Sequence, residues 1–243
     1  MLLAAGTGGQ VMGAIVIDDF NAKMAPVVAP ATDYPGLGWG LAVPYVGAGT
    51  PPYINTGVYS ETSVPGVLGG TRKTTAINHD DDIAVDLLSA SPYEYIAIST
   101  KGWYSSSYGE LHLLYDGGGG GGGLNLDMSS WTSLSVDFDP DHVGYQKSTV
   151  MGFTLNDGLN SATVSTAWTT YTEPFPRTVV TFNVPDFTTA NPSLDLSSID
   201  SILFTFEGDC AVDAAFYGIS GVPEPATMVL LAIGGLAILR RRK

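Results

Sequence analysis

Carboxylates are the residues of this chain whose placement could support chemistry, and the chemistry they favour is calcium binding. Asp18 and Asp19 follow an apolar run near the start of the sequence, and Asp213 lies in an apolar stretch near its end. These side chains would meet at one rim of a β-sandwich if its first and last strands were neighbours. Calcium takes about six to eight oxygen ligands, and such a cluster would supply some of them. Ordinary solvent-exposed charges at a sheet edge give the same pattern, so both interpretations stay open.

Aromatic residues in a segment rich in glycine and serine suggest a second kind of site. Trp103, Tyr104 and Tyr108 lie within the segment 101–108, which also contains one glycine and three serines. Flat rings beside hydroxyl groups could bind a glycan, so we predict these three residues as ligand-binding. Aromatic residues of β proteins also pack in the core or pair across strands, which is the alternative.

Patterns typical of enzymes are missing from the sequence. The histidines His79, His112 and His142 are too scattered for a recognisable zinc site, and no HExxH pair or Gly-x-Ser-x-Gly elbow is present. The glycine run 117–123 lacks the Lys and Ser or Thr of a phosphate-binding loop, and favours a flexible surface connection. We therefore predict no catalytic residue and no cofactor other than a possible structural calcium ion.

The charge of the chain excludes nucleic acid as a partner. Ten basic residues face 24 acidic ones, and four of the basic residues but only one acidic residue lie in the last 22 positions. The remaining 221 residues therefore carry 6 basic and 23 acidic residues, a net charge of −17. A body this acidic repels nucleic acid and anionic lipid, and stays soluble outside a cell.

Residues 15–221 are predicted to form a single all-β domain, a β-sandwich or jelly roll. Short runs of β-branched and aromatic residues alternate with turn residues, and Asn156-Asp157-Gly158 is a strong hairpin signal. Residues 21–62 favour long loops with one or two weak strands. The predicted strands are Ile15–Phe20, Arg72–Asn78, Glu110–Tyr115, Ser133–Phe138, Thr149–Leu155, Ala162–Thr170, Thr178–Val184, Ser201–Phe206 and Ala211–Ile219.

The C-terminus carries the strongest signal in the sequence. Pro223-Glu224-Pro225 precedes an apolar run of 14 residues, 226–239, and the basic cluster Arg240-Arg241-Arg242-Lys243. Two prolines cannot enter a helix interior, so they mark a boundary. A helix of this length spans about 21 Å, short of a hydrocarbon core of about 30 Å, and snorkelling arginines could make up part of the difference. We predict a transmembrane helix with its basic end in the cytoplasm; the alternative is a buried helix.

The order of proline-glutamate-proline motif, apolar run and basic cluster resembles the sorting signal of PEP-CTERM proteins. This resemblance implies an exported protein that is tethered in the membrane through residues 222–243 and then processed by an exosortase. The sorting residues would be Pro223, Glu224, Pro225 and the arginines Arg240, Arg241 and Arg242. At the other end, residues 1–14 resemble the remnant of a secretory signal peptide.

Three short motifs of the body are similar to those of carbohydrate-binding-like jelly rolls. They are Asp18-Asp19-Phe20, Gly69-Gly70-Thr71-Arg72 and Tyr115-Asp116-Gly117. The favoured function is a non-enzymatic protein sorted to the cell envelope or the extracellular polysaccharide matrix. A calcium-dependent module that binds exopolysaccharide is the alternative, and an envelope hydrolase is the least favoured.

Overall fold

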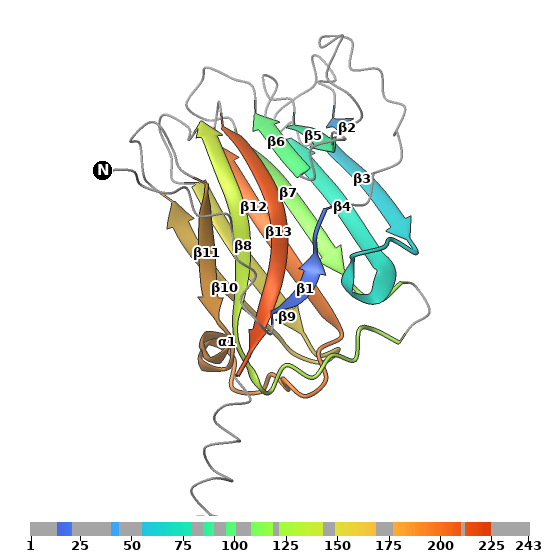
Figure 1. Cartoon of the computed structure of the whole chain (residues 1–243), viewed down its shortest axis with the longest axis vertical. Coiled ribbons are helices and arrows are strands. Elements are labelled where there is room, and N and C mark those ends of the chain that lie inside the picture. Colours follow the sequence, from blue (N-terminus) through green and yellow to red (C-terminus); the bar gives the residue numbers. More distant parts are fainter. Residues whose placement is uncertain are drawn as a thin grey trace, which may run out of the picture.

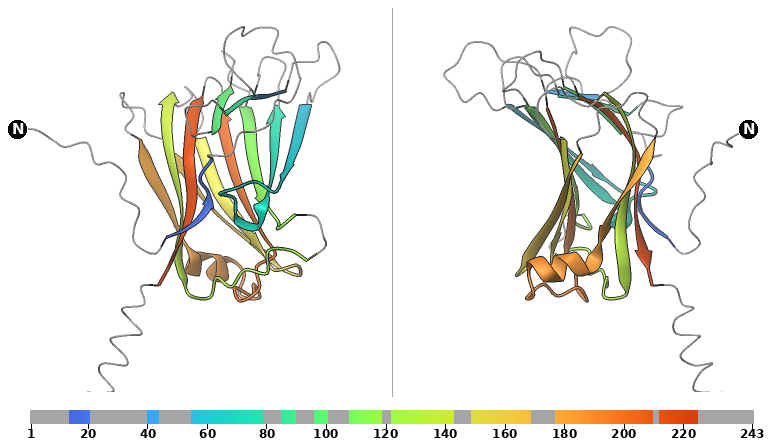
Figure 2. Two further views of the ribbon diagram at one scale, coloured as in Figure 1. Left: turned by 45° about the vertical axis from the view of Figure 1, so that its right-hand side comes forward. Right: turned by 90° about the vertical axis from the view of Figure 1, so that its left-hand side faces the viewer.

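The structure of the chain is a computed structural model (Figure 1). It describes residues 14–20, 40–43, 55–78, 85–89, 96–100, 108–118, 122–142, 149–168, 177–209 and 212–224. These segments form two antiparallel sheets that face each other, and the edge-on view in Figure 2 shows the two layers. The predicted all-β sandwich of two sheets is therefore confirmed.

The first sheet, called sheet A here, contains the first and last strands of the described chain. In order across the sheet its strands are β11 (Thr178–Asn183), β8 (Trp131–His142), β13 (Asp213–Pro223), β6 (Ile96–Thr100), β5 (Val85–Ser89) and β2 (Gly40–Val43), and β1 (Ile15–Asp18) pairs with β13. Because β13 pairs with β8, β6 and β1, it is the strand around which this sheet is organised.

The second sheet, sheet B, lies opposite and has β12 and β7 at its centre. In order its strands are β10 (Ser161–Trp168), β9 (Thr149–Asn156), β12 (Ser201–Asp209), β7 (Tyr108–Tyr115), β4 (Thr71–Asn78) and β3 (Asn55–Thr62). One short 3-10 helix (Leu68–Gly70) precedes β4. The helix α1 (Val184–Ala190) closes the end of the sandwich at which β13 finishes (Figure 1).

Phenylalanine rings from both sheets fill the centre of the sandwich. Phe204 and Phe206 of sheet B each meet Phe216 of sheet A edge to face, with ring centroids 5.5 and 5.1 Å apart. Phe153 of sheet B meets Phe182 of sheet A in the same way at 5.2 Å. The alternation of buried and outward-facing residues along β12 explains why Ser201–Phe206 was predictable as an inner strand.

Every strand predicted from the sequence is present, with ends that differ by a few residues. Strands β5 and β6 and the helix α1 were not predicted from the sequence, and Val184 was predicted to lie in a strand. Pro185 follows Val184 and starts the helix, because proline is tolerated in the first helical turn. The hairpin between β9 and β10 is confirmed, and its turn spans residues 157–160 since Asn156 pairs with Ser161.

The first glycine of the run 117–123 packs against the short 3-10 helix, and the flexibility expected of the run stays a prediction. Gly117 has a φ of +73°, a conformation that favours glycine. A methyl group added to Gly69 would lie 2.9 Å from the Cα of Gly117, so the two backbones touch. Residues 119–121 lie outside the described residues.

Among the described residues, no helix is long and apolar enough to cross a membrane. The predicted transmembrane helix at 226–239 lies outside the described residues, as do the predicted signal-peptide remnant up to residue 13 and the basic cluster. Strand β13 ends at Pro223, two residues beyond the predicted end of the domain at 221. The sandwich therefore includes the first residues of the predicted sorting tail.

Candidate functional site

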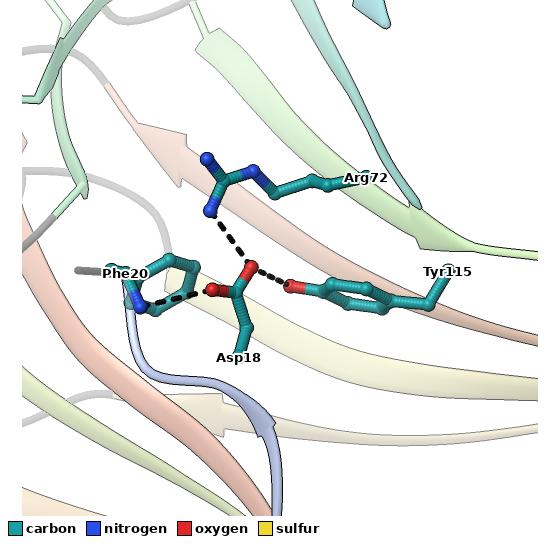
Figure 3. Close-up of polar contacts among 4 residues, drawn as sticks. All are labelled: Asp18, Phe20, Arg72 and Tyr115. Atoms are coloured by element: carbon teal, nitrogen blue, oxygen red, sulfur yellow. Dashed lines mark hydrogen bonds and ion pairs between the residues drawn. The ribbon is translucent and has the colours of Figure 1, made fainter. Parts of the chain in front are cut away.

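The three motifs that resemble those of jelly rolls meet at one buried carboxylate, Asp18. Its Oδ2 accepts a hydrogen bond from Arg72 Nη1 at 2.8 Å and one from the Tyr115 hydroxyl at 3.0 Å (Figure 3). Its Oδ1 accepts the backbone N–H of Phe20 at 2.9 Å. Asp18 is 1% exposed, and Arg72 and Tyr115 are completely buried. Asp18 belongs to sheet A and its two side-chain partners to sheet B, so the cluster joins the two sheets.

The surroundings of Asp18 act on its charge in opposite directions. Burial raises the pKa of the Asp18 carboxyl above its ordinary value, while the positive charge of Arg72 and the hydrogen bonds from Phe20, Arg72 and Tyr115 lower it. The guanidinium of Arg72 also lies 5.7 Å from the ring centroid of Phe20. Phe20 has a φ of +52°, which is unusual for a bulky residue and places its N–H toward Asp18. The role of this cluster is structural, since its buried ion pair and hydrogen bonds hold the two sheets together.

The structure separates the residues of the predicted calcium site. β1 and β13 are neighbours, as expected, but their register pairs Asp18 with Ile219. Asp213 lies six positions before Ile219, at the start of β13, which is about 20 Å away at the usual rise per residue. The expected convergence of Asp18, Asp19 and Asp213 is therefore wrong, because antiparallel register places Asp213 at the other end of the strand.

The other aspartate of the predicted set has a different neighbour. The carboxylate of Asp19 lies against Gly66, where an added methyl group would overlap it. Within the described segments, no group of three His, Cys, Asp or Glu side chains is placed to hold a metal ion. Calcium binding by the chain stays a prediction.

Of the three predicted glycan-binding residues, only Tyr108 is among the residues that the structure describes. Trp103 and Tyr104 lie outside the described residues. Tyr108 is the first residue of β7, and its backbone pairs with Asp209 at the end of β12. Their role in ligand binding stays a prediction.

The outer face of sheet A carries a polar cluster that the sequence analysis missed. Arg177 donates two hydrogen bonds to Asp137, each 2.7 Å long, and its guanidinium lies 3.8 Å from the ring centroid of Tyr217. These hydrogen bonds raise the pKa of Arg177. Forty and eighty residues separate Arg177 and Tyr217 from Asp137, so local spacing could not reveal the cluster. Arg177, the residue just before β11, thus contacts Asp137 of β8 and Tyr217 of β13, and links these strands to the start of β11.

The outer face of sheet B carries two carboxylates opposite each other. Glu110 of β7 pairs with Glu207 of β12, and His112 Nε2 lies 2.6 Å from the Glu110 carboxylate. Paired carboxylates can serve as acid and base, so these two would be the first residues to test for hydrolysis.

The sorting motif begins inside the folded domain. Pro223 is the last residue of β13 and pairs with Trp131, and the backbone N–H of Glu224 donates to the Ser130 carbonyl at 2.6 Å. Proline is tolerated here because the strand ends and no further ladder hydrogen bond is needed from its nitrogen. Pro225 and the arginines 240–242 lie outside the described residues.

Comparison with protein families identifies the same segment. A model of the PEP-CTERM protein-sorting motif matches residues 221–243. The predicted sorting signal is therefore confirmed, and it marks an exported protein that an exosortase handles at the membrane. No curated protein matches the chain.

Similar solved structures include carbohydrate-binding modules of Clostridium thermocellum. The family 11 module of the cellulosomal cellulase Lic26A-Cel5E is 14% identical, covering 87% of this chain and 95% of its own, with a TM-score of 0.42. A family 11 module in complex with a β-1,3-1,4-mixed-linked tetrasaccharide is 16% identical, covering 72% and 91%, with a TM-score of 0.37. They belong to the class named by the sequence resemblance, and at these TM-scores they carry no conclusion about a ligand of this chain.

Proposed function

We propose that this chain is a non-enzymatic exported protein, which an exosortase delivers to the cell envelope or the extracellular polysaccharide matrix. The observation that carries the proposal is a sorting motif joined to the last strand of a folded β-sandwich. The body has a net charge of −17, which keeps it soluble outside the cell and away from anionic lipid. Such a domain suits release from the membrane once its basic tail is removed.

The test compares a host whose exosortase processes other sorting-motif proteins with the same host lacking that enzyme. With the exosortase, mass spectrometry of the mature protein should show that the segment ending in Lys243 is lost. Glu224→Gln should accumulate as the precursor, while Glu207→Gln, the same change on the outer face of sheet B, should be processed like the parent. Recovery of chains that all end at Lys243 in both hosts contradicts the proposal.

A second candidate function is binding of polysaccharide by the exported domain. It is supported by the rings of Trp103, Tyr104 and Tyr108 beside glycine and serine in one segment. The full chain in detergent should then be retarded on a gel that contains the host's exopolysaccharide, and calcium would strengthen the retardation. Equal mobility with and without the polysaccharide contradicts this candidate and leaves the sorting function untouched.

The non-enzymatic part of the proposal has its own test. The purified chain should not turn over generic ester or glycoside substrates. Turnover that Glu110→Gln or Glu207→Gln abolishes would contradict it, and would place an active site at the opposed carboxylates of sheet B.

A further inference from the structure

The folded domain and the sorting signal overlap in the last residues of β13. Gly221 is the first residue matched by the sorting-motif model, and β13 continues to Pro223. In the ladder with β8, Gly221 pairs with Leu134, Val222 with Ser133 and Pro223 with Trp131. The first part of the signal is thus paired backbone of the sandwich.

Three residues at the start of β8 hold this part of the signal: Ser130, which precedes the strand, and Trp131 and Thr132, its first two residues; we call them the motif clamp. The Trp131 side chain covers Gly221 so closely that a methyl group there would overlap its six-membered ring. The hydroxyl of Thr132 donates to the Val222 carbonyl at 2.9 Å. The Ser130 carbonyl accepts the Glu224 N–H at 2.6 Å.

The clamp is itself fixed to the core. Trp131 is 5% exposed, and its backbone N–H donates to the carbonyl of Met128 at 2.9 Å. Met128 is completely buried. The clamp residues therefore stay with the core when the motif leaves the sandwich, and release of the motif requires that the end of β13 separates from the start of β8.

The clamp lies close in the sequence to the apolar run that is predicted to enter the membrane. Ala226, the first residue of that run, follows Glu224 by two positions, which span at most about 7 Å. A partner that recognises an extended segment commonly pairs with its backbone, and here the domain already uses the Val222 carbonyl and the Glu224 N–H. An enzyme that binds the motif in this way would compete with the domain for the same backbone groups.

We infer, on the basis of the exosortase processing proposed above, that the motif clamp keeps Gly221 to Glu224 bound to the sandwich, and that the exosortase processes the folded precursor only after the end of β13 separates from β8. Strand ends open locally at a small fraction of the cost of global unfolding. When opening and closing are fast, cleavage follows the population of the open form. Loss of one neutral hydrogen bond raises that population by roughly 2- to 10-fold.

Thr132→Val tests the inference, because it removes the clamping hydroxyl and keeps the shape of the side chain. In pulse-chase experiments, in a host that processes the parent chain, this variant should be processed roughly 2- to 10-fold faster. Thr154→Val is the matched control: its hydroxyl lies 2.7 Å from that of Thr163 on sheet B, the sheet that does not contain the motif. It should be processed at the parent rate.

A covalent lock tests the same inference from the opposite direction. Val222→Cys with Ser133→Cys, on a Cys210→Ser background, places two thiols at paired positions of β13 and β8. The oxidised chain should be processed several-fold more slowly than the same background with Val222→Cys alone, and dithiothreitol in the culture should restore the rate.

Hydrogen exchange of the full chain in detergent micelles gives a readout that does not depend on the enzyme. The Glu224 amide should be protected in the parent and exchange faster in Thr132→Val. The inference is overturned if the locked and unlocked chains are processed equally fast, or if the Glu224 amide exchanges in the parent as fast as in the variant. The first result would mean that the enzyme recognises the motif without moving β13.

Discussion

The buried pair of Asp18 and Arg72 makes a strong prediction about stability. Arg72→Met removes the cation that pairs with the buried Asp18 carboxylate, and Asp18→Asn removes that carboxylate from beside the buried Arg72 guanidinium. Both side chains are inaccessible to water, and their charged atoms are 2.8 Å apart. Removing one partner of such a pair costs about 3–5 kcal/mol. For a chain of this size, that loss lowers the melting temperature by roughly 6–20 °C.

The double variant separates the pair interaction from other effects of the substitutions. With Asp18→Asn and Arg72→Met together, neither charge of the pair remains; the asparagine oxygen can still accept the Phe20 N–H, and its NH2 group can donate to the Tyr115 hydroxyl oxygen. The combined loss should therefore be smaller than the sum of the two single losses, by about 2–3 kcal/mol. Arg177→Met is the control, because its partner Asp137 and the arginine itself are exposed by 32% and 51%. It should cost about 1 kcal/mol or less.

The pH dependence of Arg72→Met has a definite sign. Burial already raises the pKa of Asp18, and removal of the nearby cation raises it further. A carboxyl group whose pKa is higher in the folded state than in the unfolded state favours folding once it is protonated. The loss of stability caused by Arg72→Met should thus be greatest at a pH above the folded-state pKa of Asp18 in the variant. This loss should shrink as the pH falls toward the unfolded-state pKa near 4.

The assay is denaturant unfolding of the full chain in detergent, followed by circular dichroism at pH 7 and at mildly acidic pH. Each variant is measured in calcium chloride and in EDTA, and the loss from Asp18→Asn should be the same in both, since its partner is Arg72. Single losses no larger than that of Arg177→Met, or losses that add in the double variant, would refute the reasoning.

Three further predictions concern other parts of the chain. Three backbone N–H groups donate to Asp157 and lower its pKa, so Asp157→Ala should reduce the melting temperature at pH 7. The difference in melting temperature between the variant and the parent should shrink below pH 4, because the parent then loses the contribution of the charged carboxylate. A difference that does not change with pH would contradict this. Trp103→Ala should weaken retention on polysaccharide without lowering the melting temperature, whereas a much lower melting temperature would identify a core residue. Calcium should raise the melting temperature of the parent more than magnesium at equal concentration, because magnesium demands stricter octahedral geometry; equal shifts would indicate non-specific screening.

The sequence alone determined the elements with strong local signals. Alternation along Ser201–Phe206 predicted an inner strand, because side chains of a strand point to opposite faces in turn. Asn156-Asp157-Gly158 predicted the hairpin between β9 and β10. The order of motif, apolar run and basic cluster predicted the sorting signal, since its three parts follow one another directly in the sequence.

Weaker local signals left part of the fold unpredicted. β5 and β6 are five residues each, too short for a clear alternation. The helix α1 contains two threonines, a valine and a proline, which are poor helix formers, so its stability comes from packing of Val184 and Phe187 in the core.

Only the tertiary structure decided what the candidate site residues do. The three motifs around Asp18, Arg72 and Tyr115 were visible in the sequence, but their meeting at one buried carboxylate depends on how two sheets pack. The expected convergence of Asp18, Asp19 and Asp213 was wrong because of strand register: the adjacency of β1 and β13 does not say which residues face each other. The motif clamp likewise joins residues about ninety positions apart. Local dihedral preferences set the strands, whereas the partners of a side chain depend on register and on packing between sheets, which no local spacing encodes.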